Sequence, residues 1–295
     1  MSLVEQALAR LRQTNTAKAN VDENRSEGAV PAARTKARST SAAVATQLTL
    51  DVGRLRAAGY LPEESKDRQF ANHYRQIKRP LIAKASSEHP VGVLDSRVIM
   101  VTSALPGDGK TFTSVNLALS MARERDSSVL LVDADSPKPR VSEIFGLREQ
   151  AGLLDALEDD TIEIDSLIVP TNVRGFSLLP AGRPVEGASE LFSSDRMRQL
   201  LMSLVSNDPR RIVLLDSPPL LITSEGRALI KCAGQVLLVV HAGQTPQHAV
   251  RDAIALIDEK QAGGLVLNQG QAGLTESYYG YGAYGTDRDD TSTNN

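Results

Sequence analysis

The sequence has few of the features that mark secreted, membrane-spanning or nucleic-acid-binding proteins. It holds one cysteine, Cys232, and no tryptophan, so an intrachain disulfide is excluded and a reducing compartment is favoured. No apolar run approaches the roughly 18 residues that cross a bilayer, and the first residues lack the pattern of a secretory signal. A formal net charge of −3 gives no basis for nucleic-acid binding. We expect a cytoplasmic protein with no direct membrane span.

The remaining composition suits one α/β core with segments attached to it. The chain has 295 residues, 41% of them hydrophobic, which is enough for a sizeable core. Residues 1–13 carry apolar positions at helical spacing and predict an amphipathic helix. Residues 14–45 have few large apolar side chains and predict a flexible linker. Residues 46–95 predict a helical extension with a basic segment, in which Pro80 should lie near a helix boundary or a kink.

Six short apolar runs alternate with helical patterns between residues 96 and 268. The runs lie at 98–101, 129–132, 176–179, 212–215, 236–240 and 265–267. The helical patterns lie at 111–125, 188–206, 224–233 and 246–261. Continuous apolar runs separated by helices are typical of parallel strands that are buried on both faces. The sequence therefore predicts an α/β fold with a doubly wound, mainly parallel sheet and helices on both faces.

The first apolar run leads into a glycine-containing turn and then into helical sequence. The turn reads Ala104-Leu105-Pro106-Gly107-Asp108-Gly109-Lys110-Thr111. A strand, a turn of this kind and a helix form the geometry that cradles the phosphates of a nucleotide. The glycines let backbone N–H groups approach an anion, while Lys110 would reach the β- and γ-phosphates and Thr111 a magnesium ion. We expect ATP or GTP binding at this P-loop, although Ala104 stands where the pattern has glycine.

Acidic residues follow two of the other predicted strands. Asp133 and Asp135 come after the run at 129–132, and Asp216 comes after the run at 212–215. Ligands of parallel sheets bind at the carboxyl ends of the strands, so these three carboxylates should converge on the phosphate loop. There they could hold a magnesium ion and accept the proton of an attacking group.

These three motifs resemble the Walker A, A′ and B motifs of bacterial tyrosine kinases. Supporting stretches follow in the family's order at Gly152–Asp155, Leu179–Gly182, Ser189–Leu191 and Val266–Asn268. Residues 1–7, 77–80 and 223–225 are similar to the exosortase-associated polysaccharide autokinases of that family. The resemblance covers about residues 70–285 and implies a P-loop, ATP-binding kinase domain at 96–268.

The resemblance also implies ATP as phosphate donor, Mg²⁺ as metal ion and a role for each motif residue. The nucleotide-binding residues would be Pro106, Gly107, Asp108, Gly109, Lys110, Thr111, Phe112 and Asn268, the last near the adenine ring. Thr111, Asp133 and Asp216 are the expected metal ligands. Lys110, Asp133, Asp135 and Asp216 are the expected catalytic residues. Asp133 would act as the base toward a tyrosine hydroxyl, and Asp135 would tune the metal site.

Tyrosines are concentrated in the segment 269–295, which is predicted to be a flexible tail. Four of the chain's six tyrosines lie there, at Tyr278, Tyr279, Tyr281 and Tyr284. Beside a kinase domain they are the expected phosphoacceptors, modified in trans by an adjacent subunit. The alternative is an aromatic and glycine-rich tail with no chemical role. Each phosphate adds about −1.5 to −2 charge, so phosphorylation should loosen tail docking and alter assembly.

Two family motifs depart from their usual form. The subunit-contact helix usually reads Glu-x-x-Arg-x-x-Arg, but Asn72 takes the place of the glutamate. Arg75, Lys78 and Arg79 are the expected subunit contacts of a homo-oligomer, with a solvated basic face as the alternative. Pro137 takes the place of an arginine in Walker A′.

The resemblance implies that the autokinase regulates exopolysaccharide chain length or export. A membrane polysaccharide co-polymerase would activate it and recruit it to the inner face of the cell membrane. Two other functions stay open. One is a catalytically weak nucleotide-binding regulator of polysaccharide export, favoured by the altered motifs. The other is a partitioning or site-placement ATPase, disfavoured by Leu105, which stands where such proteins carry a second lysine.

Overall fold

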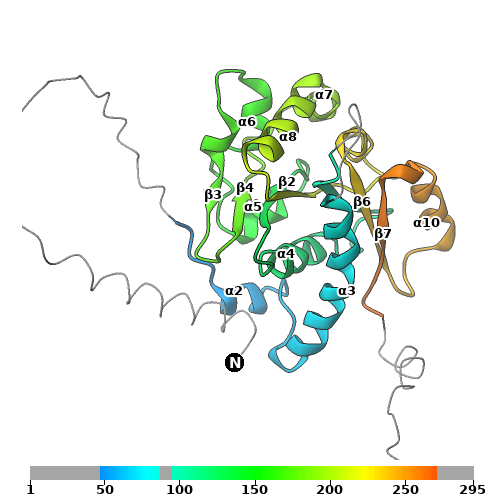
Figure 1. Ribbon diagram of the computed structural model, residues 1–295. Helices are drawn as coiled ribbons and strands as arrows, with labels where there is room; N and C mark the ends of the chain where they lie inside the picture. The colour runs from blue at the N-terminus through cyan, green and yellow to red at the C-terminus, as the bar shows by residue number, and fades with distance from the viewer. Residues whose placement is uncertain (1–46, 87–94, 271–295) are drawn as a thin grey trace, which may run out of the picture.

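The computed structural model describes residues 47–86 and 95–270. The predicted amphipathic helix at 1–13, the linker at 14–45 and the four tyrosines of the C-terminal cluster lie outside these residues. Within them, one seven-stranded sheet carries helices on both faces (Figure 1). The predicted doubly wound α/β fold with a mainly parallel sheet is confirmed.

The strands of the sheet lie in the order β3-β4-β2-β5-β1-β6-β7. Their bounds are β1 (Val98–Ser103), β2 (Ser128–Asp133), β3 (Val169–Pro170), β4 (Phe176–Leu179), β5 (Arg211–Asp216), β6 (Gln235–His241) and β7 (Ala262–Asn268). All neighbours are parallel except β3 and β4. The six predicted strands are all present, and β3 is an addition that is too short to show a sequence period.

The two faces of the sheet are covered by different parts of the chain. One face packs against α2 (Val52–Ala57), α3 (Asp67–Ala85), α4 (Lys110–Met121) and α5 (Arg140–Ile144). The other packs against α6 (Leu153–Glu158), α7 (Ala188–Ser193), α8 (Asp195–Asn207), α9 (Ser224–Leu229) and α10 (Gln247–Ile254). In β1, Ile99 and Val101 pack in the core on the side of α2 to α5, whereas Val98 and Met100 pack in the core on the side of α6 to α10. Both strand faces are thus buried, which explains the continuous apolar run.

The predicted helices are shorter than expected, and α4 ends at Met121 rather than at residue 125. The pattern at 188–206 is divided between α7 and α8 because Ser194 is extended and its Oγ accepts a hydrogen bond from the Met197 N–H, capping α8. The pattern at 224–233 ends as the 3₁₀ turn Ile230–Cys232, and the pattern at 246–261 includes the separate 3₁₀ turn Glu259–Gln261. Two further 3₁₀ turns lie at Glu64–Lys66 and Ile164–Leu167.

Pro80 lies inside α3 rather than at a helix boundary. An internal proline costs about 3 kcal/mol because it removes a backbone hydrogen bond. Tyr74, Leu81 and Ala85 are buried on the same helix, and burial of large apolar side chains offsets such a cost. Among the described residues, no helix has both the length and the apolar character needed to cross a bilayer.

The strand order brings the three motif-bearing strand ends together. β5 lies between β1 and β2. Asp216 at the end of β5 is the register partner of Asp133 on one side and of Val101 on the other. The carboxyl ends of β1, β2 and β5 therefore lie next to one another, where ligands of parallel sheets bind.

Candidate functional site

The loop between β1 and α4 has the backbone form that a phosphate cradle needs. Gly107 and Gly109 adopt left-handed conformations with φ of 90° and 93°, which residues with a side chain adopt only with strain. A Cβ on Gly109 would also collide with the side chain of Asn268. Gly109 caps the N-terminus of the 12-residue helix α4. The free N–H groups of that helix end and its positive dipole favour an anion.

Asp108 holds the loop to two other parts of the site. Its Oδ1 accepts a hydrogen bond of 2.8 Å from Thr245 Oγ1, in the segment between β6 and α10. Its Oδ2 accepts a 3.4 Å hydrogen bond from the Leu105 N–H within the loop. Its backbone carbonyl accepts a 2.9 Å hydrogen bond from Asn268 Nδ2, at the end of β7. The loop is therefore anchored by residues more than 130 positions away in the chain.

Asp216 lies beside the first turn of α4 and accepts two hydroxyl hydrogen bonds. Thr111 Oγ1 donates to Oδ2 and Ser114 Oγ donates to Oδ1, both at 2.8 Å. Burial raises the pKa of Asp216 to about 6, although the two hydroxyls and the charge of Lys110 act in the opposite direction. The threonine of the P-loop and the aspartate of β5, both expected as metal ligands, are thus in direct contact.

Asp133 is completely buried and is held by Ser142 of α5. The Ser142 N–H and Oγ each donate to Asp133 Oδ2 at 2.7 Å. Burial and the neighbouring charge of Asp216 raise the pKa of Asp133 to about 8, while the hydrogen bonds from Ser142 lower it. A carboxyl group in this range can take up a proton near neutral pH.

Asp135 completes the acidic group on the side of the phosphate loop. Burial raises its pKa, and the charge of Lys110 is the largest opposing cause. Lys110 itself is only 8% exposed, and its charge lowers the pKa of both Asp135 and Asp216. The positive charge of Lys110 thus acts on both carboxylates.

This arrangement fits a nucleotide with a hard cation. Among the described residues, no group of three or more histidine, cysteine or acidic side chains is placed to hold a metal by itself. Mg²⁺ sites of P-loop proteins do not need one, because one or two protein oxygens and the phosphates complete the shell. Thr111, Asp133 and Asp216 offer only oxygen donors, which suit Mg²⁺.

Two predicted nucleotide contacts have partners within the protein. The ring of Phe112 contacts Phe70 of α3 edge-on, with 6.0 Å between centroids. Asn268 donates to the loop carbonyl of Asp108. Pro106 and Gly107 are exposed. The phosphate side of the loop is therefore open, and the Asn268 amide is part of the loop's support.

The extension before the domain also reaches this site. Asn116 Nδ2 of α4 donates to the Tyr60 carbonyl at 2.8 Å. Burial raises the pKa of Tyr60, opposed by Arg140 and assisted by Glu143 and Asp216. Residues 47–86 therefore pack along the helix that carries the P-loop.

Of the three expected subunit contacts, Lys78 lies in an unexpected environment. It is only 6% exposed, and its Nζ contacts the Ser120 carbonyl at 2.7 Å and Glu124 Oε1 at 2.7 Å. Its charge is engaged within the chain, which is at odds with a contact to another subunit. Arg75 and Arg79 are exposed and stay candidates for that role.

Sequence reasoning missed three residues that support the site. Ser114 follows Thr111 by one helical turn, so a helical wheel could have found it. Ser142 and Thr245 reach Asp133 and Asp108 only through the tertiary fold, and no local pattern marks either of them.

Comparisons with known proteins agree with this geometry. The model of the AAA domain family matches residues 96–264. The chain is 31% identical over 191 residues to the tyrosine-protein kinase YwqD of Bacillus subtilis. These aligned residues cover 64% of this chain and 77% of YwqD. It is also 31% identical over 191 residues to the tyrosine-protein kinase wzc of Salmonella typhimurium, again over 64% of this chain. The match spans about a quarter, 26%, of wzc.

A solved structure supports the same relationship. The kinase domain of the Escherichia coli tyrosine kinase ETK superposes with a TM-score of 0.51 and 29% sequence identity. The superposition covers 64% of this chain and 71% of that chain. The residues that the family model matches, 96–264, include the P-loop and all three aspartates of the site.

Proposed function

The chain belongs to the AAA domain family and, within it, to the bacterial tyrosine-protein kinases, and from this premise we propose that it is an ATP-dependent autokinase. It transfers the γ-phosphoryl group of ATP to tyrosines of the cluster Tyr278, Tyr279, Tyr281 and Tyr284 on an adjacent copy. The finding that carries the proposal is the convergence of an open phosphate loop with Lys110 and three aspartates at one end of the sheet.

Nucleotide binding follows from the loop and the first turn of α4. The left-handed Gly107 and Gly109 turn backbone N–H groups toward the bound phosphates. Lys110 follows the loop directly, and its charge acts on Asp135 and Asp216, so its ammonium group can pair with a phosphate oxygen beside them. Asp108, tied to Thr245, keeps the loop in this form before the nucleotide arrives, which reduces the entropy lost on binding.

Thr111 and Asp216, with Asp133 beside them, are the residues that would hold Mg²⁺. The metal ion supplies charge that stabilises the phosphates during transfer. Thr111 Oγ1 and Asp216 Oδ2 are already 2.8 Å apart, which brings their oxygens within the span of one coordination shell. Ser114 keeps the Asp216 carboxylate oriented from its other oxygen.

The proton of the acceptor tyrosine goes to Asp133. The phenol oxygen forms a bond to the γ-phosphorus, the bond to the β-phosphate oxygen breaks, and ADP leaves. Asp133 suits the role of base because burial and Asp216 raise its pKa to about 8. The charge of Lys110 lowers the pKa of the nearby Asp135.

The proposal extends to assembly and partners by similarity to the family. Copies form a homo-oligomer with Arg75 and Arg79 at the contact, and the tail of one copy reaches the site of the next. A membrane polysaccharide co-polymerase activates the kinase at the inner face of the cell membrane, so that phosphorylation regulates exopolysaccharide chain length or export. Phosphates on one tail repel each other, which loosens the docking of the tail on the adjacent copy. Light scattering should therefore show different oligomer distributions before and after phosphorylation.

Mass spectrometry of the purified chain tests the proposal. Intact-mass and peptide spectra are recorded before and after incubation with ATP and Mg²⁺. Phosphate should appear on the tail tyrosines and be absent from a Lys110→Met variant and from a variant with Tyr278, Tyr279, Tyr281 and Tyr284 changed to Phe. Tyr60 and Tyr74 serve as internal controls that should stay unmodified.

A different outcome would overturn the kinase assignment. If the wild-type chain binds ATP but stays unmodified even when the cytoplasmic segment of a membrane partner is supplied, it is a nucleotide-dependent regulator instead. Phosphate that persists in the Lys110→Met variant would point to a contaminating kinase.

A further inference from the structure

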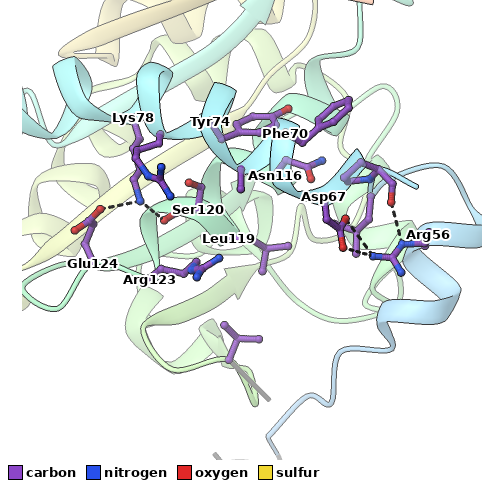
Figure 2. A pocket seen from close by; sticks show the side chains of 15 residues that line it. Arg56, Asp67, Phe70, Tyr74, Lys78, Asn116, Leu119, Ser120, Arg123 and Glu124 are labelled. Carbon is purple, nitrogen blue, oxygen red and sulfur yellow. Dashed lines mark hydrogen bonds and ion pairs between the residues drawn. The ribbon is translucent and has the colours of Figure 1, made fainter. Parts of the chain in front are cut away.

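A pocket separate from the phosphate loop lies between α2, α3 and α4. Its volume is about 280 Å³, just below the range of about 300–1,000 Å³ for small-molecule sites, so it suits one or two side chains. Figure 2 shows two ion pairs at opposite sides, with Tyr74, Asn116 and Leu119 between them. Leu61, Pro62, Phe70 and Val173 complete the apolar lining.

The two acidic side chains of this pocket are already neutralised. Asp67 pairs with Arg56 at 3.0 Å, and Glu124 pairs with Lys78 at 2.7 Å. Because each carboxylate is paired with a cation, its repulsion of an incoming anion is weakened. Burial raises the pKa of Tyr74, so the phenol in the wall stays neutral.

Two exposed guanidinium groups at the pocket have no acidic partner among the residues that the structure describes. Arg75 donates only to the neutral Asn72 Oδ1, at 2.9 Å. Arg123 has no hydrogen bond or ion pair to any residue within 47–86 or 95–270. An arginine binds a phosphate through charge-assisted, often paired, hydrogen bonds and also stacks on aromatic rings. The pocket thus combines apolar walls with two cations available for an anionic aromatic group.

The two terminal segments of the chain differ in their fit to such a pocket. Residues 271–295 carry four tyrosines and four acidic residues against one arginine. Residues 1–46 carry no aromatic residue, and their seven basic residues exceed their four acidic ones. Charge and ring content both favour the C-terminal segment.

The C-terminal segment also starts within reach of the pocket. Asn268 contacts the loop at Asp108, and Asn116, which lines the pocket, lies two helical turns along α4, or about 10 Å from the loop. Tyr278 is ten residues beyond Asn268, and ten extended residues span up to about 33 Å. In Figure 1, β7 and α3 lie side by side, and Lys84 of α3 bonds the Lys260 carbonyl at 2.7 Å.

We propose that this pocket, here called the α3–α4 pocket, binds a phosphorylated tyrosine of the chain's own C-terminal tail through Arg75 and Arg123. This rests on the proposed function for the presence of the phosphate. The docked tail is held away from the active site of the adjacent copy after transfer. It also occupies Arg75, one of the expected subunit contacts, and so couples phosphorylation to assembly.

Peptide binding tests the pocket without any kinase activity. A synthetic peptide of residues 277–290 is prepared with and without phosphate on its tyrosines, and its anisotropy is titrated with the full chain carrying the four Tyr→Phe changes. The phosphorylated peptide should bind at least tenfold more tightly. An Arg75→Gln, Arg123→Gln double variant should lose at least tenfold in affinity, whereas Arg125→Gln, an exposed neighbour outside the pocket, should lose none.

Controls separate this pocket from the other possible sites. Lys110→Met and a saturating non-hydrolysable ATP analogue should leave the affinity unchanged. Loss of binding in either case would place the peptide at the phosphate loop and overturn the proposal. Equal affinity for the two peptide forms would also overturn it, as would preferential binding of a peptide of residues 2–13.

A second preparation tests whether the tail docks in its own chain. The same phosphopeptide is ligated as the tail of the full chain, and the free labelled peptide is titrated again. An attached ligand has a high effective concentration, so the free peptide should bind at least tenfold more weakly at every protein concentration. Unchanged affinity would rule out docking within one chain. A chain that binds the phosphopeptide but never phosphorylates itself would overturn only the proposed function.

Discussion

Asp133 and Asp216 are direct register partners at the carboxyl ends of β2 and β5, and neither is exposed. Asp133 accepts hydrogen bonds from the Ser142 N–H and hydroxyl, and Asp216 accepts them from the hydroxyls of Thr111 and Ser114. Burial raises the pKa of both, and the charge of Asp216 raises that of Asp133 further. The hydrogen bonds from these donors lower both pKa values and so oppose the effect of burial.

Replacement of Ser142 by alanine should move the pH dependence of phosphorylation. The Ser142 hydrogen bonds favour the ionised form of Asp133, so losing the hydroxyl raises its pKa further above 8. The ionised base is then scarcer at neutral pH, and the acidic limb of the kcat profile should shift to higher pH. Phosphorylation rates between pH 5.5 and 9.5 measure this. Ser193→Ala, at an exposed helical serine, is the control, and an unshifted limb in Ser142→Ala would remove Asp133 from the role of base.

Replacement of Thr245 by valine should weaken ATP binding with little effect on kcat. Thr245 Oγ1 donates to Asp108 and accepts from the His241 N–H, and one such hydrogen bond contributes about 1 kcal/mol. The KM for ATP should rise about fivefold on this basis. Thr245→Ser keeps the hydroxyl and should bind ATP as the wild type does. A loss of ATP affinity in Thr245→Ser but not in Thr245→Val would show that the methyl group, not the hydrogen bond, supports the loop.

Replacement of Lys78 by methionine should destabilise the fold. The ammonium satisfies the Ser120 carbonyl and Glu124, and leaving a buried acceptor unpaired costs about 1–3 kcal/mol. Urea unfolding should show this loss, whereas Arg79→Gln, on the exposed side of α3, should stay within about 0.5 kcal/mol. If Lys78→Met instead keeps wild-type stability and lowers only the oligomer mass, the residue is a subunit contact after all.

Replacement of Asp155 by asparagine should cost more stability at pH 7 than at pH 3. Burial raises the pKa of this carboxyl, but hydrogen bonds from the Gly152 N–H and from Arg183 outweigh it, so the net pKa is lowered. A lowered pKa stabilises the fold above the unfolded value of about 3.9, and that contribution is lost as the pH falls through the folded value. Urea midpoints of both proteins at the two pH values measure the difference. If the difference in urea midpoint between the two proteins is as large at pH 3 as at pH 7, packing rather than the charge of Asp155 causes the loss of stability.

Residues on the strands and in the loop could be predicted because their signals are local. Gly107 and Gly109 mark a turn by their identity, and Asp133 and Asp216 each end an apolar run. The rule that parallel strands present their carboxyl ends together then placed both aspartates beside the loop, as the register shows.

Residues that depend on packing could not be predicted in this way. Lys78 lies in a basic run that suggested a solvated or subunit-contacting face, yet α3 turns it toward α4. The spacing of charges along a helix does not reveal which face another helix will cover. Ser142 and Thr245 are common surface residue types, and only the fold brings them to the site.

The hydrogen bond from Asn268 to the Asp108 carbonyl gives the end of the last strand a mechanical connection to the phosphate loop. Only Gln269 and Gly270 lie between that asparagine and the start of the tyrosine-bearing segment at residue 271. Because these two residues are a short connection, tension on the segment would act on the Asn268 side-chain amide and, through its hydrogen bond, on the phosphate loop. Force applied to that segment would thus act on the phosphate loop through the Asn268 amide, and on the end of β6 through the Asn268 carbonyl, which accepts from the Ala242 N–H.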